Sequence, residues 1–261
     1  MNVIAVLCAR NEERYLKATV KALNSQSLPL SRIIVVNDGS TDATAQIAAE
    51  HGCSVIHLPC HEGSYRGKPL MAKVWNSGLD QAKQFNPDYL LSMGADHVLP
   101  VHYVQSLVER MELDNRLVVC SGVIDGEVGE LATPRGSGRL TKADYWSRLN
   151  GLTYPVYWGW EEYVLFKALQ EGYTVRCFLD VRSSVQRATR QLEAVDQLLI
   201  PEMYVLGYSW PFIIAKCVRD RMPLSEFVHG VRLTRHLKKL DFAEYVRKTC
   251  DWKLVSTLRR K

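Results

Sequence analysis

The clearest sign of the architecture is VIAVLCARNEERYLKATVKAL, residues 3–23, in which a short apolar run passes directly into a helical pattern. Val3–Cys8 is continuously apolar, which is typical of a strand covered on both faces of a parallel sheet. Asn11 is expected to cap the helix that follows, whose apolar residues recur at helical spacing. A strand that leads into a helix is the repeating unit of α/β proteins.

The same alternation of strand and helix patterns continues through the first half of the chain. Further strands are predicted at Ile33–Val36, Ser54–Leu58, Tyr89–Met93 and Leu117–Val123. Strands joined by helices pair in parallel through right-handed crossovers, so we expect an α/β fold with an open, mostly parallel sheet flanked by helices. Such sheets bind ligands beyond the carboxyl ends of their strands. The candidate ligand-binding positions are therefore Cys8–Asn11, Asn37–Asp42 and Gly94–His97.

Composition excludes several classes of protein. The 261 residues are 47% hydrophobic and 23% charged, as in soluble globular proteins, and this excludes a disordered or collagen-like chain. The longest stretch without a charged residue, Met203–Ala215, is shorter than the roughly 20 residues of a spanning helix. The amino terminus has no signal-peptide pattern, and the seven cysteines include no C-x-x-C pair. A cytoplasmic protein with reduced thiols is therefore expected.

The carboxyl-terminal part has a different composition from the rest. Residues 216–261 hold 13 lysines and arginines against 5 acidic residues. We expect a catalytic domain over residues 1–195 and a helical, basic extension over 196–261. The aromatic residues of Met203–Ala215, followed by basic residues, suit a helix in the headgroup region of a membrane. A helix packed on the first domain is the alternative, because apolar stripes of this kind also form cores.

Acidic residues follow the predicted strands and begin a later helix. Asp96 lies at a strand end and is suited to Mg²⁺ or Mn²⁺, which prefer carboxylate oxygen, with the adjacent His97 as a candidate second ligand. The alternative is that Asp96 caps the helix predicted to begin near Pro100. Glu161 and Glu162 lie at a helix start, where carboxylates are stabilised, and either could act as a general base.

Other motifs indicate phosphate binding and exclude several enzyme classes. Arg66 and Lys68 flank Gly67, and a cationic loop before a helix suits a phosphate chain. The chain lacks the glycine motifs of P-loop and dinucleotide-binding proteins and the nucleophile elbow of α/β-hydrolases. One further cluster has residue types that suit zinc, but its spacing fits no common zinc site: His51, Cys53, His57, Cys60 and His61.

Taken in order, five segments resemble the family 2 glycosyltransferases, which have a GT-A fold. They are VIAVLCARNEE (3–13), VVNDGSTD (35–42), GKPLMAKVWNSGL (67–79), MGADHVLP (93–100) and WGWEEYVL (158–165). The resemblance covers roughly residues 1–180. It implies a nucleotide-sugar donor such as a UDP- or GDP-sugar, a divalent cation (Mg²⁺ or Mn²⁺), and an inverting transfer to an acceptor hydroxyl.

The resemblance also implies roles for individual residues. Glu162 would be the catalytic base with Glu161 beside it, and Asp96 would be the last acid of the D-x-D metal motif, with His97 adjacent. Gly94 stands where that motif usually has its first acid. Donor-binding roles are implied for Cys8, Arg10, Asn11, Asp38, Arg66 and Lys68.

The resemblance bears on the acceptor as well. The chain lacks the Q-x-x-R-W motif of processive synthases, and the nearest match to it is Gln186-Arg187. Transfer of a single sugar is therefore favoured over polymerisation. Family relatives often act on lipid-linked or cell-envelope acceptors, which leaves peripheral contact with the inner face of a membrane open.

Two other classes of protein share some of these features. A sugar nucleotidyltransferase would have a glycine-rich loop after the first strand, where this chain has none. A non-catalytic nucleotide-sugar-binding module is suggested by Gly94, since an acid is missing there. No nucleic-acid partner is expected, because the basic extension has no stacking or groove-reading motif.

Overall fold

The computed structural model describes residues 1–127, 134–187 and 193–249, so the last part of the predicted basic extension lies outside it. Its strands are β1 (Val3–Ala9), β2 (Arg32–Asp38), β3 (Ser54–Leu58), β4 (Tyr89–Gly94), β5 (His97–Val98), β6 (Leu117–Ile124), β7 (Arg139–Lys142) and β8 (Thr174–Val185). Its helices are α1 (Leu16–Asn24), α2 (Thr44–Glu50), α3 (Leu70–Lys83), α4 (Tyr103–Leu113), α5 (Ala143–Asn150), α6 (Trp160–Gln170), α7 (Glu193–Leu206), α8 (Trp210–Arg219) and α9 (Leu224–Thr234).

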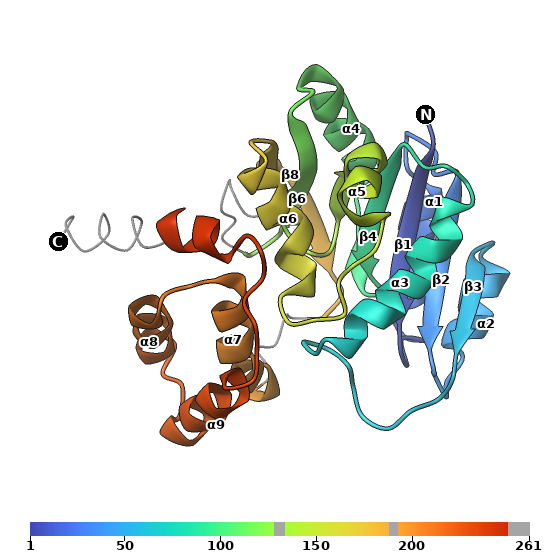
Figure 1. Cartoon of the computed structure of the whole chain (residues 1–261). Coiled ribbons are helices and arrows are strands. Elements are labelled where there is room, and N and C mark those ends of the chain that lie inside the picture. The colour runs from blue at the N-terminus through green and yellow to red at the C-terminus, as the bar shows by residue number, and fades with distance from the viewer. Residues whose placement is uncertain (128–133, 188–192, 250–261) are drawn as a thin grey trace.

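The strands form one curved sheet in the order β3-β2-β1-β4-β7-β6-β8-β5 (Figure 1). The four strands β3, β2, β1 and β4 pair in parallel, as predicted for a mostly parallel α/β sheet. β7 is antiparallel to both of its neighbours, and β5 is antiparallel to β8. These two short strands were not predicted, because each has too few residues to show a period of its own.

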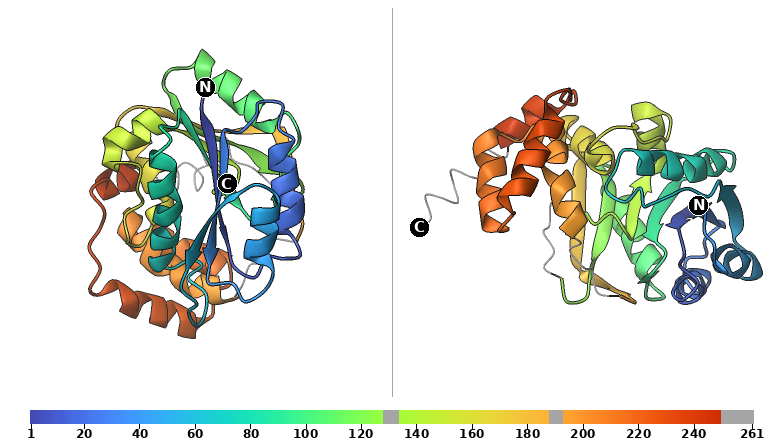
Figure 2. Two further views of the ribbon diagram at one scale, coloured as in Figure 1. Left: turned by 90° about the vertical axis from the view of Figure 1, so that its right-hand side faces the viewer. Right: turned by 90° about the horizontal axis from the view of Figure 1, so that it is seen from below.

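Helices cover both faces of the sheet (Figure 2). Apolar side chains of α1, α2 and α4 pack on one face, and those of α3, α5 and α6 pack on the other. α3 approaches closely because Gly78 has no side chain: a Cβ there would lie 2.5 Å from Val6 Cγ1 and 2.8 Å from Val36 Cγ2. This close packing buries the middle of the sheet. The loops that follow the strands form the edge at which the parallel strands end.

The loop after β1 does not cap a helix as predicted. Asn11 has a φ of +54°, and α1 begins only at Leu16, with no side-chain cap. Instead, Asn11 Oδ1 accepts a hydrogen bond from Thr41 N at 2.9 Å, and Asn11 N donates to Ser40 Oγ at 3.0 Å. Asn11 therefore joins the loops that follow β1 and β2. The helix between β2 and β3, α2, begins at Thr44, whose backbone N–H donates to Asp42 Oδ1 at 3.0 Å.

The carboxyl-terminal helices pack against the first part of the chain through α6. Leu206, Phe242 and Val246 form a small core with Tyr163 and Phe166 of that helix. This packing is one of the two alternatives that the sequence left open. Among the described helices, none is both long enough and apolar enough to cross a membrane.

Candidate functional site

Three parallel strands end together and bring their terminal residues to one edge of the sheet. Cys8 of β1 is the register partner of Val36 in β2 and of Gly94 in β4. The loops after these strands are therefore neighbours, as the sequence predicted for Cys8–Asn11, Asn37–Asp42 and Gly94–His97. This edge holds two groups of polar contacts, one around Asp38 and one around Asp96.

The first group joins Asp38 to Arg10 through a histidine. The buried carboxylate of Asp38 has Oδ1 3.0 Å from His61 Nε2, and Arg10 Nη2 donates to the carbonyl oxygen of His61 at 2.5 Å. The ring of Tyr65 stacks on that of His61, with centroids 3.9 Å apart. Burial, and secondarily the charge of Asp38, raises the pKa of the Cys8 thiol well above its usual value, so that thiol stays neutral. The stacked rings of His61 and Tyr65 offer a planar surface beside the buried carboxylate of Asp38, and this combination suits a nucleobase.

Arg66 and Lys68 are not brought into this group. Both side chains are exposed on the loop between β3 and α3, and neither has a side-chain partner among the described residues. The residues of that loop that reach the site are His61 and Tyr65, which sequence reasoning did not assign to it. The sequence indicates His61 only as part of the zinc-like cluster, and the described residues hold no such metal group.

The second group places Asp96 against an arginine from the other end of the sheet. Asp96 Oδ2 lies 2.6 Å from Arg187 Nε, and Arg187 Nη2 lies 2.7 Å from Glu12 Oε1. The guanidinium also lies over the ring of Tyr15, 5.2 Å from its centroid. Burial raises the pKa of Glu12, although Arg187 opposes that rise. Neither Arg187 nor Glu12 was predicted, since 175 residues separate the two in sequence.

His97 is a buried structural residue in this arrangement. Its Nε2 lies 2.8 Å from Ser183 Oγ, and its Nδ1 lies 2.6 Å from Ser137 Oγ. Ser183 Oγ donates to the carbonyl oxygen of Val123, so it accepts from Nε2, and Nδ1 then accepts from Ser137. Burial lowers the pKa of His97 to about 4, which keeps the ring neutral. Both ring nitrogens are therefore engaged.

These contacts do not fit the divalent-cation site predicted at Asp96 and His97. The lone pair that His97 would offer to a metal is occupied by Ser137, and one oxygen of Asp96 is held by Arg187. A Cβ on Gly94 would lie 3.2 Å from Asp96 Oδ1 and 3.3 Å from Ser137 Oγ, so a larger side chain would crowd the turn. The described residues contain no group of three metal-ligating side chains.

The start of α6 brings the predicted base to the same edge. Arg139, almost fully buried, donates from Nη1 to the carbonyl oxygen of Glu161 at 2.9 Å and so holds the first turn of the helix. A Cβ on Gly136 would lie 1.7 Å from Glu161 Oε1. Ser137, the next residue, contacts Gly94 and His97. Residues 136–138 therefore lie between the Asp96 turn and the start of α6.

Glu162 contacts a second carboxyl group that the sequence did not indicate. Its side chain is hydrogen-bonded to Glu202 of α7, and its Oε2 is buried with no partner among the described residues. Burial raises the pKa of Glu162 well above its usual value, and Glu202 and Glu161 raise it further. Burial also raises the pKa of Glu202. The two carboxyls therefore share a proton, with Glu162 as the donor.

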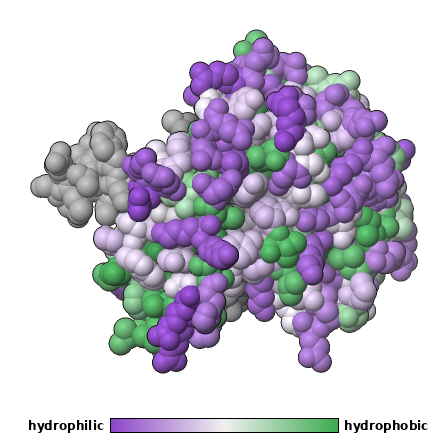
Figure 3. All heavy atoms as spheres, in the orientation of Figure 1, coloured by the Kyte–Doolittle hydropathy of each residue, from purple (hydrophilic) through white to green (hydrophobic). Residues whose placement is uncertain are grey.

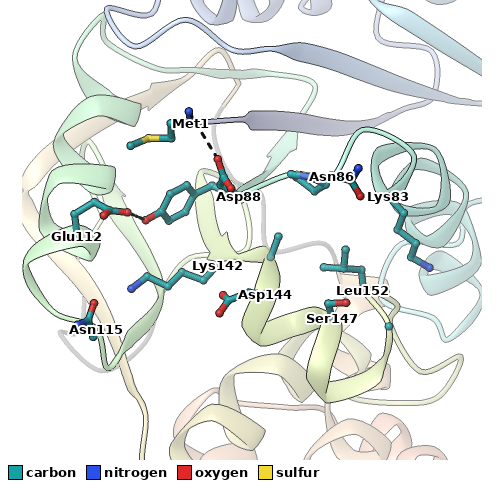
Figure 4. A pocket seen from close by; sticks show the side chains of 14 residues that line it. Met1, Lys83, Asn86, Asp88, Glu112, Asn115, Lys142, Asp144, Ser147 and Leu152 are labelled. Carbon is teal, nitrogen blue, oxygen red and sulfur yellow. Dashed lines mark hydrogen bonds and ion pairs between the residues drawn. The ribbon is translucent and has the colours of Figure 1, made fainter.

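A cavity of about 800 Å³ lies away from this edge (Figure 4). Met1, Asp88 and Glu112 line it, at the amino-terminal ends of β1 and β4 and beside α4. None of the predicted site residues is among its lining residues. Ligands of open parallel sheets bind at the carboxyl ends of the strands, so the candidate site remains the edge around Asp38, Asp96 and Glu162.

Comparison with known proteins identifies the group to which this arrangement is similar. Residues 4–169 match the sequence profile of "Glycosyl transferase family 2". The chain is 22% identical over 149 residues to an "Uncharacterized glycosyltransferase" of Haemophilus influenzae, a match covering 54% of this chain and 43% of that protein. The matched part therefore spans less than half the length of that relative.

Solved structures show the same fold at low sequence identity. S. aureus TarS in complex with UDP-GlcNAc superposes with a TM-score of 0.56 and 16% identity, covering 78% of this chain and 66% of that chain. The mannosyltransferase PcManGT from Pyrobaculum calidifontis, in complex with GDP-Man and Mn²⁺, gives a TM-score of 0.59 and 14% identity, covering 97% and 80%. The fold is thus that of GT-A glycosyltransferases, as the sequence indicated.

Proposed function

We propose, because the chain belongs to glycosyltransferase family 2, that it moves one sugar from a nucleoside diphosphate sugar to an acceptor hydroxyl. The observation that carries the proposal is the meeting, at one edge of the sheet, of the Asp38–His61 group, the Asp96 turn and the start of α6. The Asp38–His61 group suits a nucleobase, and the start of α6 supplies the buried carboxyl group of Glu162. Structural relatives that bind UDP-GlcNAc and GDP-Man support a UDP- or GDP-sugar as donor.

We assign the role of general base to Glu162. Its Oε2 is buried and has no partner among the described residues. Once the proton that Glu162 shares has passed to Glu202, the Glu162 carboxylate can accept the proton of an acceptor hydroxyl. The hydroxyl oxygen then bonds to the anomeric carbon, and the bond to the diphosphate breaks with its electron pair leaving on the phosphate oxygen. Attack from the face opposite the leaving group inverts the anomeric centre. A raised pKa brings the base nearer to the operating pH, which favours proton transfer.

Glu162→Gln tests this assignment. A positioned base contributes about 10²–10⁴ in rate, so kcat should fall by that factor while the KM for donor changes little. Release of nucleoside diphosphate from a panel of UDP- and GDP-sugars, with hydroxyl acceptors, provides the assay. Glu171→Gln, at the exposed end of α6, is the matched control. Unchanged turnover in Glu162→Gln would remove this residue from the role.

The acceptor is proposed to lie at an anionic membrane surface, which α8 and α9 contact. Trp210, Ile214 and Val218 recur every four residues on α8 and are exposed, the last by 73%, and Leu224 on α9 is 77% exposed. Hydrophobic atoms gather where these helices lie, at the lower left of Figure 3. Basic residues lie among them, at Lys216, Arg219 and Arg221. Exposed apolar residues interleaved with cations suit a headgroup region.

Vesicle co-sedimentation tests the membrane contact. The chain should bind vesicles of phosphatidylglycerol and phosphatidylcholine at low salt, and Val218→Asp should weaken that binding because a carboxylate would face the anionic headgroups. Leu113→Asp is the control, since Leu113 is 88% exposed at the end of α4. Equal binding by Val218→Asp and the parent chain would refute the contact while leaving the transferase proposal intact.

A further inference from the structure

We propose that the guanidinium group of Arg187 is the cation that neutralises the donor's diphosphate in this chain, in the place where a divalent metal was expected. The inference rests on the proposed function, since it concerns the leaving group of that reaction. A sugar nucleotide leaves readily only when the charge developing on its diphosphate is stabilised by fixed positive groups. The residues around Asp96 do not fit a metal, whereas a cation of the chain itself lies there.

The position of Arg187 is set by the sheet. Val185, at the end of β8, is the register partner of His97 in β5. The next residue, Gln186, donates from its backbone N–H to the carbonyl oxygen of Asp96 at 2.9 Å. Its side-chain Nε2 donates to the carbonyl oxygen of Tyr15 at 2.9 Å. The backbone on the amino-terminal side of Arg187 is therefore tied both to the Asp96 turn and to the loop before α1.

The side chain of Arg187 is held but not enclosed. It uses Nε to contact Asp96 at 2.6 Å and Nη2 to contact Glu12 at 2.7 Å, and Tyr15 lies under the guanidinium plane. A guanidinium has five N–H donors, so three have no partner among the described residues. The side chain is 44% exposed. A planar donor fork fixed on one side and open on the other suits the oxygens of a phosphate group.

The two carboxylates act as positioning residues for this cation. An unpaired arginine loses rotamer freedom when it binds a ligand, and part of that cost is avoided when the side chain is already held. Asp96 thus keeps a place at the diphosphate end of the site, but through Arg187. A metal ion could contact Asp96 without displacing Arg187 only through Oδ1, because Oδ2 lies 2.6 Å from the guanidinium.

Titration calorimetry with UDP and GDP tests the inference on the full chain, once in EDTA and once in Mn²⁺. We expect the parent chain to bind one of the two nucleotides with a Kd that changes less than about threefold between the buffers, since no metal is needed. Arg187→Ala should weaken binding in EDTA by about 10- to 100-fold, the value of a charge-assisted hydrogen bond to phosphate. The Kd of Arg187→Lys should lie between those of the parent and Arg187→Ala, because lysine keeps the positive charge but lacks the planar set of guanidinium donors.

The controls separate a binding role from a structural one. Arg176→Ala removes an exposed arginine from β8, the strand that precedes Arg187, and should leave Kd unchanged. Arg187→Lys covers the case in which Arg187→Ala fails to fold. Binding by the parent chain only in Mn²⁺, or binding by Arg187→Ala as tight as that of the parent, would overturn the inference alone. Failure of both nucleotides to bind in either buffer would overturn the proposed function and the inference with it.

Discussion

Replacing Glu202 with Gln should change how the stability of the protein depends on pH. In the folded state Glu162 keeps its proton above the usual carboxyl pKa of 4.5, because it is buried and hydrogen-bonded to Glu202. The unfolded chain releases that proton. The free energy of unfolding of the parent chain should therefore fall as the pH rises from about 4.5 toward the raised pKa of Glu162.

The slope follows from the number of protons involved. A difference of one proton between the folded and unfolded states changes the free energy of unfolding by about 1.4 kcal/mol per pH unit. Glu202→Gln removes the neighbouring charge, and the new amide oxygen can still accept the hydrogen bond from Glu162. The pKa of Glu162 then falls toward its usual value. The variant should therefore gain stability relative to the parent as the pH rises, by at most that slope.

Urea unfolding at a series of pH values between 4.5 and 8 measures this difference directly. Comparing variant with parent cancels the contributions of groups that both proteins share, including Glu161 and Arg139, which also face Glu162. Glu171→Gln, on the exposed end of α6, should give a curve parallel to that of the parent. Parallel curves for Glu202→Gln as well would refute the shared proton between the two carboxyls.

Three further changes have expected results. His61→Ala should raise the Kd for the nucleotide about tenfold by calorimetry, since it removes the stack with Tyr65, and an unchanged Kd would exclude this ring from the base pocket. Gly159→Ala should lower the free energy of unfolding in urea by about 2–5 kcal/mol, because φ is +71° and a Cβ would lie 2.6 Å from Leu206 Cδ2. Gly151→Ala is the control: its φ is also positive but the space around it is open, so it should lower the free energy of unfolding only by the cost of placing alanine in that backbone conformation. Ser137→Ala should cost about 1–3 kcal/mol by the same assay, since it leaves a partner of His97 missing, and a cost near zero would contradict the hydrogen bond.

The sequence predicted the fold well where periodicity is local. The apolar runs at Val3–Cys8 and Ser54–Leu58 are strands. It failed at short strands such as β5, and at Asn11, where an asparagine fits a helix cap and an interloop contact equally well. Local pattern cannot tell such alternatives apart, because the partner that decides between them is distant in sequence.

The candidate site was predictable only in part, for the same reason. Asp38 and Asp96 could be placed at strand ends because each directly follows an apolar run. Arg187 and Glu202 have no such signal, since each matters only through a carboxyl group far away in the chain. Residue types at motif positions therefore indicated which edge of the sheet forms the candidate site, and long-range contacts decide which charged groups lie there.

If Glu162 is the general base, as proposed, its hydrogen bond to Glu202 makes the reaction centre depend on two parts of the chain. A chimera that keeps residues 1–195 and takes its last helices from a relative would exchange the surface offered to acceptors. It would also exchange Glu202, one of the groups that, after burial, raise the pKa of Glu162. Specificity and pH optimum would then be inherited together, so recombination between such enzymes cannot alter one without retuning the other.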